Sequence, residues 1–357
     1  MPGSPRSRIL TVAILIAAIV TSIGVAVVRA TPAPSPTLPP VDPPALIASV
    51  LRAAEARTPV SGVVTTHLDL GIPQLPESLA GSAAGLTDLL SDQTVKVWRS
   101  PDGLRLAQIL PFAERTLVAS RSDVWLWDSQ TATAAHLGID AKGPGPSADP
   151  RIPDPPALAA KLIRTVEPYA HVATGEPVVV AGRDAYALEL TPVSDTTLVG
   201  RIEVAVDAST RVPLRVEVFP KGGNGAVVEA GFSTVSFAPI DPAMFSFTPP
   251  PGARVTQVPY PAGAAAHDSA AAAAPAGGAA AAQEAPLPSF PDVRVSGKGF
   301  GVVFAVRSPT VPRSVSSLLP YSGPLGSAEV VERGDHVWIV AGLVPPDVLD
   351  STAQKLP

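Results

Sequence analysis

The side chains that most often carry out chemistry are few in this sequence, and their spacing matches no common catalytic arrangement. The five histidines stand far apart, at His67, His136, His171, His267 and His336. No two of them have the spacing of zinc ligands, the HExxH and GxSxG motifs are absent, and no cysteine is present. The pattern predicts no catalytic residues, no metal site, no cofactor and no enzymatic activity.

Glycine-rich runs, charge and cysteine content argue against further classes of function. The glycine-rich runs 222–225 and 297–301 do not lead from a predicted strand into a predicted helix, as phosphate-binding loops do. The net charge of −5 and the charged fraction of 16% leave no basic stripe for nucleic acid. Without cysteine there are no disulfides and no acylated thiol. A strand-rich chain without an active site is expected to hold a ligand or a partner.

The N-terminal residues have the composition of an export segment. Arg6 and Arg8 precede an uninterrupted apolar run at residues 9–28, and Val28-Arg29-Ala30 offers a cleavage site. The same run, about 20 residues long, would also span a bilayer as a helix. Residues 1–30 are therefore predicted to be a signal peptide or an N-terminal membrane anchor. Both alternatives place the body of the protein outside the cytoplasm, either secreted or anchored to the cell membrane.

Two low-complexity segments divide the remaining chain. Residues 31–42 form a proline-rich spacer, and residues 259–289 form an Ala/Pro/Gly-rich linker without apolar periodicity. They delimit a large module at 43–258 and a small C-terminal module at 290–357.

The large module is predicted to be a curled antiparallel sheet covered by helices. Helical spacing follows Pro43 and again runs from about Pro155 to Tyr169. Between and after these helices, short alternating runs are separated by turn signals such as residues 100–103. A large twisted sheet with one apolar face tends to curl and needs a cover. The predicted fold class is α+β: an unclosed β-barrel with helices on its apolar concave face.

The small module is predicted to be α+β as well. Strands are expected at residues 293–295, 301–307 and 336–341, a helix at 313–319 and a final helix from Pro346. The sequence does not reveal a partner for this module.

Two apolar features of the large module have alternative interpretations. The segment after the first strand is either a surface insertion or a movable lid, and its candidate lid residues are Leu75, Leu79, Leu86, Leu89 and Leu90. Trp125 and Trp127 stand two apart, so both project from one face of a strand. This pair either packs the core or lines a ligand cavity.

The order of several short motifs resembles a known superfamily. The motifs are Ser61-Gly-Val-Val, Leu70-Gly-Ile-Pro-Gln-Leu-Pro, Val97-Trp98, Asp123-Val-Trp-Leu-Trp-Asp-Ser and Phe237-Ala-Pro-Ile-Asp-Pro-Ala-Met-Phe-Ser-Phe. Together, over about residues 43–258, they look like an actinobacterial family within the superfamily of the lipoprotein carrier LolA and the N-terminal domain of the regulator RseB, also called MucB. The resemblance implies an unclosed β-barrel with a helical lid around a hydrophobic cavity that accepts acyl chains.

Two functional hypotheses follow. In the first, a carrier-like protein holds a lipid or the acyl chains of a lipoprotein. In the second, an RseB-like regulator docks on a membrane anti-sigma factor or transporter. Strand phase selects the residues expected to line the cavity: Leu104, Leu106, Trp125, Trp127, Leu188, Leu190, Val204, Val216, Phe232 and Phe245.

Overall fold

The computed structural model describes residues 36–71, 92–138, 155–258, 293–308, 311, 316, 318–334 and 336–356. The predicted export segment, most of the spacer, all five lid candidates, the linker and most of the predicted helix at 313–319 lie outside these residues. None of the helices within the described ranges has the length and apolar character needed to cross a membrane.

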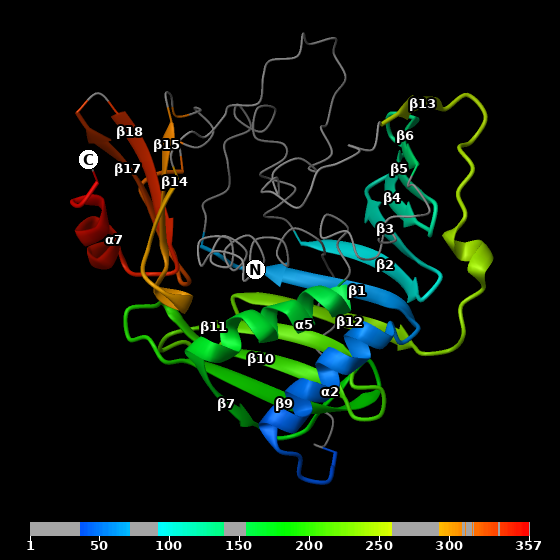
Figure 1. Cartoon of the computed structure of the whole chain (residues 1–357), viewed down its shortest axis with the longest axis horizontal. Coiled ribbons are helices and arrows are strands. Elements are labelled where there is room, and N and C mark those ends of the chain that lie inside the picture. Colours follow the sequence, from blue (N-terminus) through cyan, green and yellow to red (C-terminus); the bar gives the residue numbers. More distant parts are fainter. Residues whose placement is uncertain are drawn as a thin grey trace, which may run out of the picture.

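Most of the described chain forms one sheet, whose strand order is β13-β6-β5-β4-β3-β2-β1-β12-β11-β10-β9-β7, with β8 paired to β9 (Figure 1). Its strands are β1 (Val60–Leu68), β2 (Gln93–Ser100), β3 (Gly103–Leu110), β4 (Ala113–Ala119), β5 (Asp123–Asp128), β6 (Thr133–Gly138), β7 (Ala170–Thr174), β8 (Val178–Val180), β9 (Arg183–Pro192), β10 (Val199–Asp207), β11 (Pro213–Pro220), β12 (Val228–Ser236) and β13 (Arg254–Gln257). Neighbouring strands are antiparallel, except that β13 pairs with β6 in parallel. The sheet does not close into a barrel.

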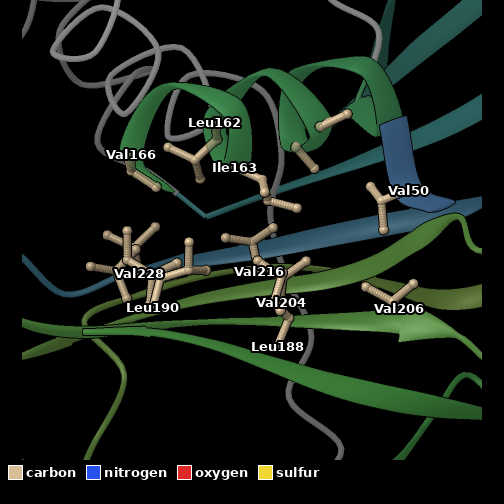
Figure 2. Packing of buried hydrophobic residues seen from close by; sticks show 14 of the residues in the cluster. Val50, Leu162, Ile163, Val166, Leu188, Leu190, Val204, Val206, Val216 and Val228 are labelled. Carbon is tan, nitrogen blue, oxygen red and sulfur yellow. The ribbon is translucent and has the colours of Figure 1, made fainter. Parts of the chain in front are cut away.

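Two helices cover one half of this main sheet, over β9 to β12 (Figure 1). Helix α2 (Pro43–Ala56) begins with prolines that suit a first turn, and it ends where Arg57 adopts a left-handed conformation. Helix α5 is Pro155–Val166. In Figure 2, Val50 of α2 and Ile163 of α5 point toward the side chains of the strands below. Burying this apolar face is the reason that the helices dock here.

The other half of the main sheet, strands β2 to β6, forms what we call the wing. After β12 the chain continues as residues 237–258, here called the strap, which crosses the wing and includes the short 3₁₀ helix η3 (Pro242–Phe245). The strap ends in β13, which pairs with the outermost strand β6. Added in this way, β13 covers one side of β6 that would otherwise present unpaired backbone groups.

A second sheet contains the C-terminal residues, in the order β14-β15-β18-β17-β16. Its strands are β14 (Val293–Ser296), β15 (Val303–Ser308), β16 (Tyr321–Ser322), β17 (Ser327–Arg333) and β18 (His336–Gly342), and helix α7 (Pro346–Ala353) follows them. One face packs on α7 through Trp338, Val340 and Leu349, all of them buried. The wing and the second sheet lie on opposite sides of helices α2 and α5 (Figure 1).

The two sheets share a core. Phe300 of the 3₁₀ helix η4 (Gly299–Gly301) and Leu325 belong to the same buried cluster as the side chains under α2 and α5. The backbone carbonyl of Leu343 accepts hydrogen bonds from the Thr197 hydroxyl, at 2.8 Å, and from the Leu198 N–H, at 2.9 Å. The second sheet is therefore joined to the main sheet by buried apolar side chains as well as by polar contacts.

The predicted α+β fold with a large curled sheet is confirmed, and the two expected helices of the large module are present. Several strands were not expected from the sequence: β6, β7, β13, β16 and β17. Short strands such as β6, with the sequence TAAHLG, carry few β-branched residues, so their pairing partners decide their conformation more than propensity does. The parallel pairing of β13 was also not expected.

Candidate functional site

Four of the expected cavity residues lie under the helices. Leu188, Leu190 and Val204 are completely buried, and Val216 is nearly so. They pack against side chains of α2 and α5 in one continuous cluster (Figure 2). This part of the concave face is a packed protein core. The side chains of α2 and α5 fill the space above it, so no room is left there for a ligand.

Three further candidates continue the same face toward the wing. The register pairs Val204 with both Leu188 and Val216, and Val216 in turn with Ala230 of β12. Phe232 stands two residues beyond Ala230, so it shares this face, and Leu104 and Leu106 share it in β3. Leu104 and Phe232 are buried, whereas Leu106 is half-buried.

The inner face of the wing is apolar but less covered. Directly opposite residues form a row across β3 to β6: Leu106, Leu117, Leu126 and Ala135. Leu126 keeps 47% of its surface exposed. The described helices α2 and α5 lie over the other half of the sheet, so they do not cover this row (Figure 1).

The remaining three candidates lie on the opposite, outer face of the wing. Arg105, which lies between Leu104 and Leu106, is opposite Val118, and Val118 is opposite Trp125. Because side chains alternate along a strand, Trp125 and Trp127 point away from the face that carries the two leucines. The rings of both tryptophans lie about 6 Å from Phe247 of the strap, with centroid distances of 5.6 Å and 6.1 Å.

Phe245 of the strap belongs to this outer face as well. Gly103 leaves room for it, since a Cβ there would lie 2.8 Å from the Phe245 Cβ. Trp125 also stacks on His136 at 4.0 Å, and His136 is within hydrogen-bond distance of Asp123, at 2.7 Å. These aromatic residues hold the strap, and the structure separates them from the seven candidates of the concave face.

The second sheet carries an apolar face that the sequence analysis did not single out. On the side away from α7, directly opposite residues form the row Phe304, Ala341, Ala328 and Tyr321 across β15, β18, β17 and β16. Two alanines between two aromatic rings make a trough with a low floor. The next row on the same face is Val306, Ile339 and Val330, all half-buried.

A cavity of about 270 Å³ lies where this trough meets the main sheet. Its walls are almost entirely apolar, and they include Leu70 at the end of β1, Phe300, Leu325 and Leu343 in addition to the residues of the trough. The Tyr321 hydroxyl donates a hydrogen bond of 2.6 Å to the Leu70 carbonyl at this point. Burial raises the pKa of Tyr321, and the nearby Asp69 carboxylate raises it further. The phenol is therefore neutral at physiological pH.

A larger hollow, of about 500 Å³, lies beside α2 and is lined by Arg52, Thr58, Thr210 and Arg211 together with small side chains. It is an open groove on the surface, and the side chains of Arg52 and Arg211 contribute charge to its lining. The cavity at the second sheet is smaller, but its apolar lining and few polar groups are typical of a site for an apolar ligand.

Within the described ranges, no cluster of three or more His, Cys, Asp or Glu side chains has an arrangement that could bind a metal ion. The two histidine–carboxylate pairs, His67 with Asp92 and His136 with Asp123, are each built into the sheet between neighbouring strands. The candidate site therefore offers apolar contact and no group placed for acid–base or metal chemistry.

No protein-family model matches this chain, and no curated protein matches it. Solved structures do match. The MucA/MucB complex of Pseudomonas aeruginosa aligns with 88% of this chain and 97% of the matched chain, at 13% identity and a TM-score of 0.49. MucB alone covers 86% of this chain and 95% of its own length, at 15% identity and a TM-score of 0.42.

A LolA superfamily protein from Nitrosomonas europaea covers 58% of this chain and 99% of its own length, at 12% identity and a TM-score of 0.22. The solved structures that are similar to this chain thus include MucB and a LolA superfamily protein.

Proposed function

We propose that this chain is a non-enzymatic extracytoplasmic protein that holds an acyl chain of a lipid or lipoprotein in the cavity at the second sheet. The observation that carries the proposal is the trough of Ala328 and Ala341 between Tyr321 and Phe304, which lines an apolar cavity together with Leu70. The predicted export segment and the resemblance to the lipoprotein-carrier superfamily support the same function.

The energetics favour an acyl ligand over a polar one. A cavity of about 270 Å³ takes part of one chain, and each buried methylene stabilises the complex by about 0.8 kcal/mol. A polar ligand would lose its water and gain few partners, because the walls are almost entirely apolar and the Tyr321 proton is already donated to the Leu70 carbonyl. Headgroups are therefore expected to stay outside the cavity.

The site differs from the one expected from strand phase. Leu188, Leu190 and Val204 serve to bind helices α2 and α5, as their complete burial indicates. The cavity at the second sheet is where we expect the ligand to be held.

A second function, docking on a membrane protein such as an anti-sigma factor or transporter, is favoured by the extent of the apolar face. Beyond the trough this face continues through Val306, Ile339 and Val330 to Val293, which is 42% exposed. This continuous surface is wider than one acyl chain needs, and it would suit an apolar segment of a protein.

The test is native mass spectrometry of the chain as cells export it, followed by organic extraction. A lipid in stoichiometric amount is expected. Ala341→Leu fills the floor of the trough and is expected to remove the lipid, whereas Ala135→Leu on the inner face of the wing is the matched control and should retain it. Thermal unfolding of both variants verifies that they fold.

Two results would contradict lipid binding in this cavity. The first is a ligand-free mass that persists after incubation with membrane lipids, which would favour the docking function. The second is loss of lipid in Ala135→Leu with retention in Ala341→Leu, which would place the ligand against the wing.

A further inference from the structure

The hairpin between β3 and β4 ends in an unusual tip. Leu110 pairs with Ala113, so Pro111 and Phe112 are the two residues of the turn. The Phe112 side chain is fully exposed, and its φ is +62°. Ile109, which precedes this turn in β3, is 38% exposed.

An aromatic residue is poorly suited to this position if folding alone is considered. A positive φ at the second position of a two-residue turn favours Gly or Asn, because a side chain there crowds the backbone. Phe112 gains no packing in return, since all of its surface is exposed. Packing within the described residues therefore gives no reason for an aromatic side chain at this position.

The other hairpins of the wing have polar tips. The β5–β6 hairpin carries Gln130 and Thr131, and the β4–β5 hairpin carries Arg121 and Ser122. Just behind the Phe112 tip, Arg115 is paired with Asp128 at 3.1 Å. The Glu114 carboxylate, two residues after Phe112, accepts a hydrogen bond from the Thr116 hydroxyl. The β3–β4 hairpin thus presents a small apolar tip in front of these charged residues.

We propose that Phe112, supported by Ile109, inserts into the surface layer of a lipid bilayer and docks the wing on the membrane. A bilayer accepts a single protruding apolar side chain without a shaped recess. A stable protein interface would need roughly 1,000 Å² of buried surface, which two side chains do not supply. Phenylalanine is one of the residues by which proteins anchor in the interfacial layer.

The predicted N-terminal anchor would add the membrane affinity that a single aromatic side chain lacks. Alone, Phe112 would bind a membrane only weakly, but the apolar run at 9–28 is long enough to hold the chain on a bilayer. Tethering raises the effective concentration of the tip at the surface. This inference does not depend on the proposed acyl ligand.

Because the chain has no cysteine, a single fluorophore can be placed at will. The full chain carrying Pro111→Cys, labelled with an environment-sensitive dye, would be reconstituted in phosphatidylcholine/phosphatidylglycerol vesicles. We expect a shift of the emission to shorter wavelength and quenching by nitroxide-labelled lipids. Adding Phe112→Ser should abolish both effects. The matched control, Thr131→Cys on the β5–β6 hairpin, should report water in every case.

Each other outcome would overturn the proposal. A dye at position 111 that reports water in vesicles means that the tip stays in solution. A shift that persists with Phe112→Ser means that the dye itself enters the lipid. A shift without nitroxide quenching means that the tip is buried against protein, which would assign it to a protein partner.

Discussion

The phenol of Tyr321 in the second sheet donates a hydrogen bond of 2.6 Å to the backbone carbonyl of Leu70, at the end of the first strand of the main sheet. The two residues are 251 positions apart in the chain. Both line the apolar cavity, so the contact that joins the two sheets also lies at the proposed ligand site. Assembly of the site therefore depends on the assembly of the two sheets.

Replacing Tyr321 with Phe removes this hydrogen bond and leaves the half-buried Leu70 carbonyl without its donor. We expect the free energy of unfolding to fall by about 1 kcal/mol, measured by chemical denaturation. Tyr169→Phe is the matched control, because the ring of Tyr169 lies against Gly299 at the same junction and its hydroxyl makes no hydrogen bond within the described residues. Equal losses in both variants would contradict a specific role of the Tyr321–Leu70 contact.

Replacing Trp125 with Ala removes a ring that contacts both His136 and Phe247 of the strap. We expect the free energy of unfolding to fall by about 2 kcal/mol, and proteolysis within residues 237–258 to become faster. Leu126→Ala is the control, since Leu126 follows in the same strand and points to the inner face. Faster cleavage of the strap in the Leu126 variant alone would show that the assignment of faces is wrong.

Asp207 is a buried carboxylate at the turn between β10 and β11. Burial alone would raise its pKa, but hydrogen bonds from Arg183, at 2.8 Å and 3.2 Å, and from Thr210 hold the pKa below its ordinary value. We expect Asp207→Ala to lower the free energy of unfolding by about 3 kcal/mol at pH 7.

The pH dependence of this effect follows from the lowered pKa. Asp207 stabilises the folded state above the ordinary aspartate pKa of about 4, and this contribution is lost as the pH falls through the lower pKa of the folded state. The difference between wild type and Asp207→Ala should therefore shrink in acid, measured by denaturation across pH 2 to 7. Asp195→Ala, which removes an exposed carboxylate, should show little effect. A difference that stays constant with pH would contradict the ionic role.

Glu217 is the third of four glutamates that stand directly opposite one another across β9 to β12: Glu189, Glu203, Glu217 and Glu229. Burial raises the pKa of Glu217. Arg215, whose Nε lies 2.9 Å from a Glu217 oxygen, opposes this rise, and the Glu229 and Glu203 carboxylates add to it. Ionised glutamates in opposite positions repel each other, so the row costs stability at neutral pH.

Glu217→Gln should therefore increase the free energy of unfolding by roughly 0.5–1 kcal/mol at pH 7. The folded state holds the Glu217 proton more tightly than the unfolded state does. Protonated Glu217 therefore contributes stability below the unfolded pKa of about 4.3, and this stability is lost as the pH rises through the raised pKa of the folded state. The gain of the variant should vanish in acid. Glu176→Gln in an exposed loop is the control, and an equal gain there would argue against repulsion within the row.

Parts of the candidate site could be read from local pattern. The alternation in β10, where Ile202, Val204 and Val206 face the helices, is a property of one strand and its period of two. The same period placed Trp125 and Trp127 together on one face. The period could not show whether this is the inner or the outer face of the wing, because the strap that covers the two tryptophans joins the sheet more than a hundred residues later.

The trough in the second sheet could not be predicted from the pattern within single strands. Phe304, Ala341, Ala328 and Tyr321 come from four strands, and two of these strands, β16 and β17, were not expected from the sequence. An alanine gives no signal of a ligand site by itself. It becomes the floor of a cavity only when the register sets it between two aromatic rings.

The sequence by itself determined the fold class of this protein: a curled sheet with helices on its apolar face. Those properties depend on composition, on alternation within a strand and on turns between neighbours, which are all local. The tertiary structure alone decided which apolar face is packed and which is left open, since pairing between distant strands sets the register. A shift of one residue in that register would turn every side chain of a strand to the other face.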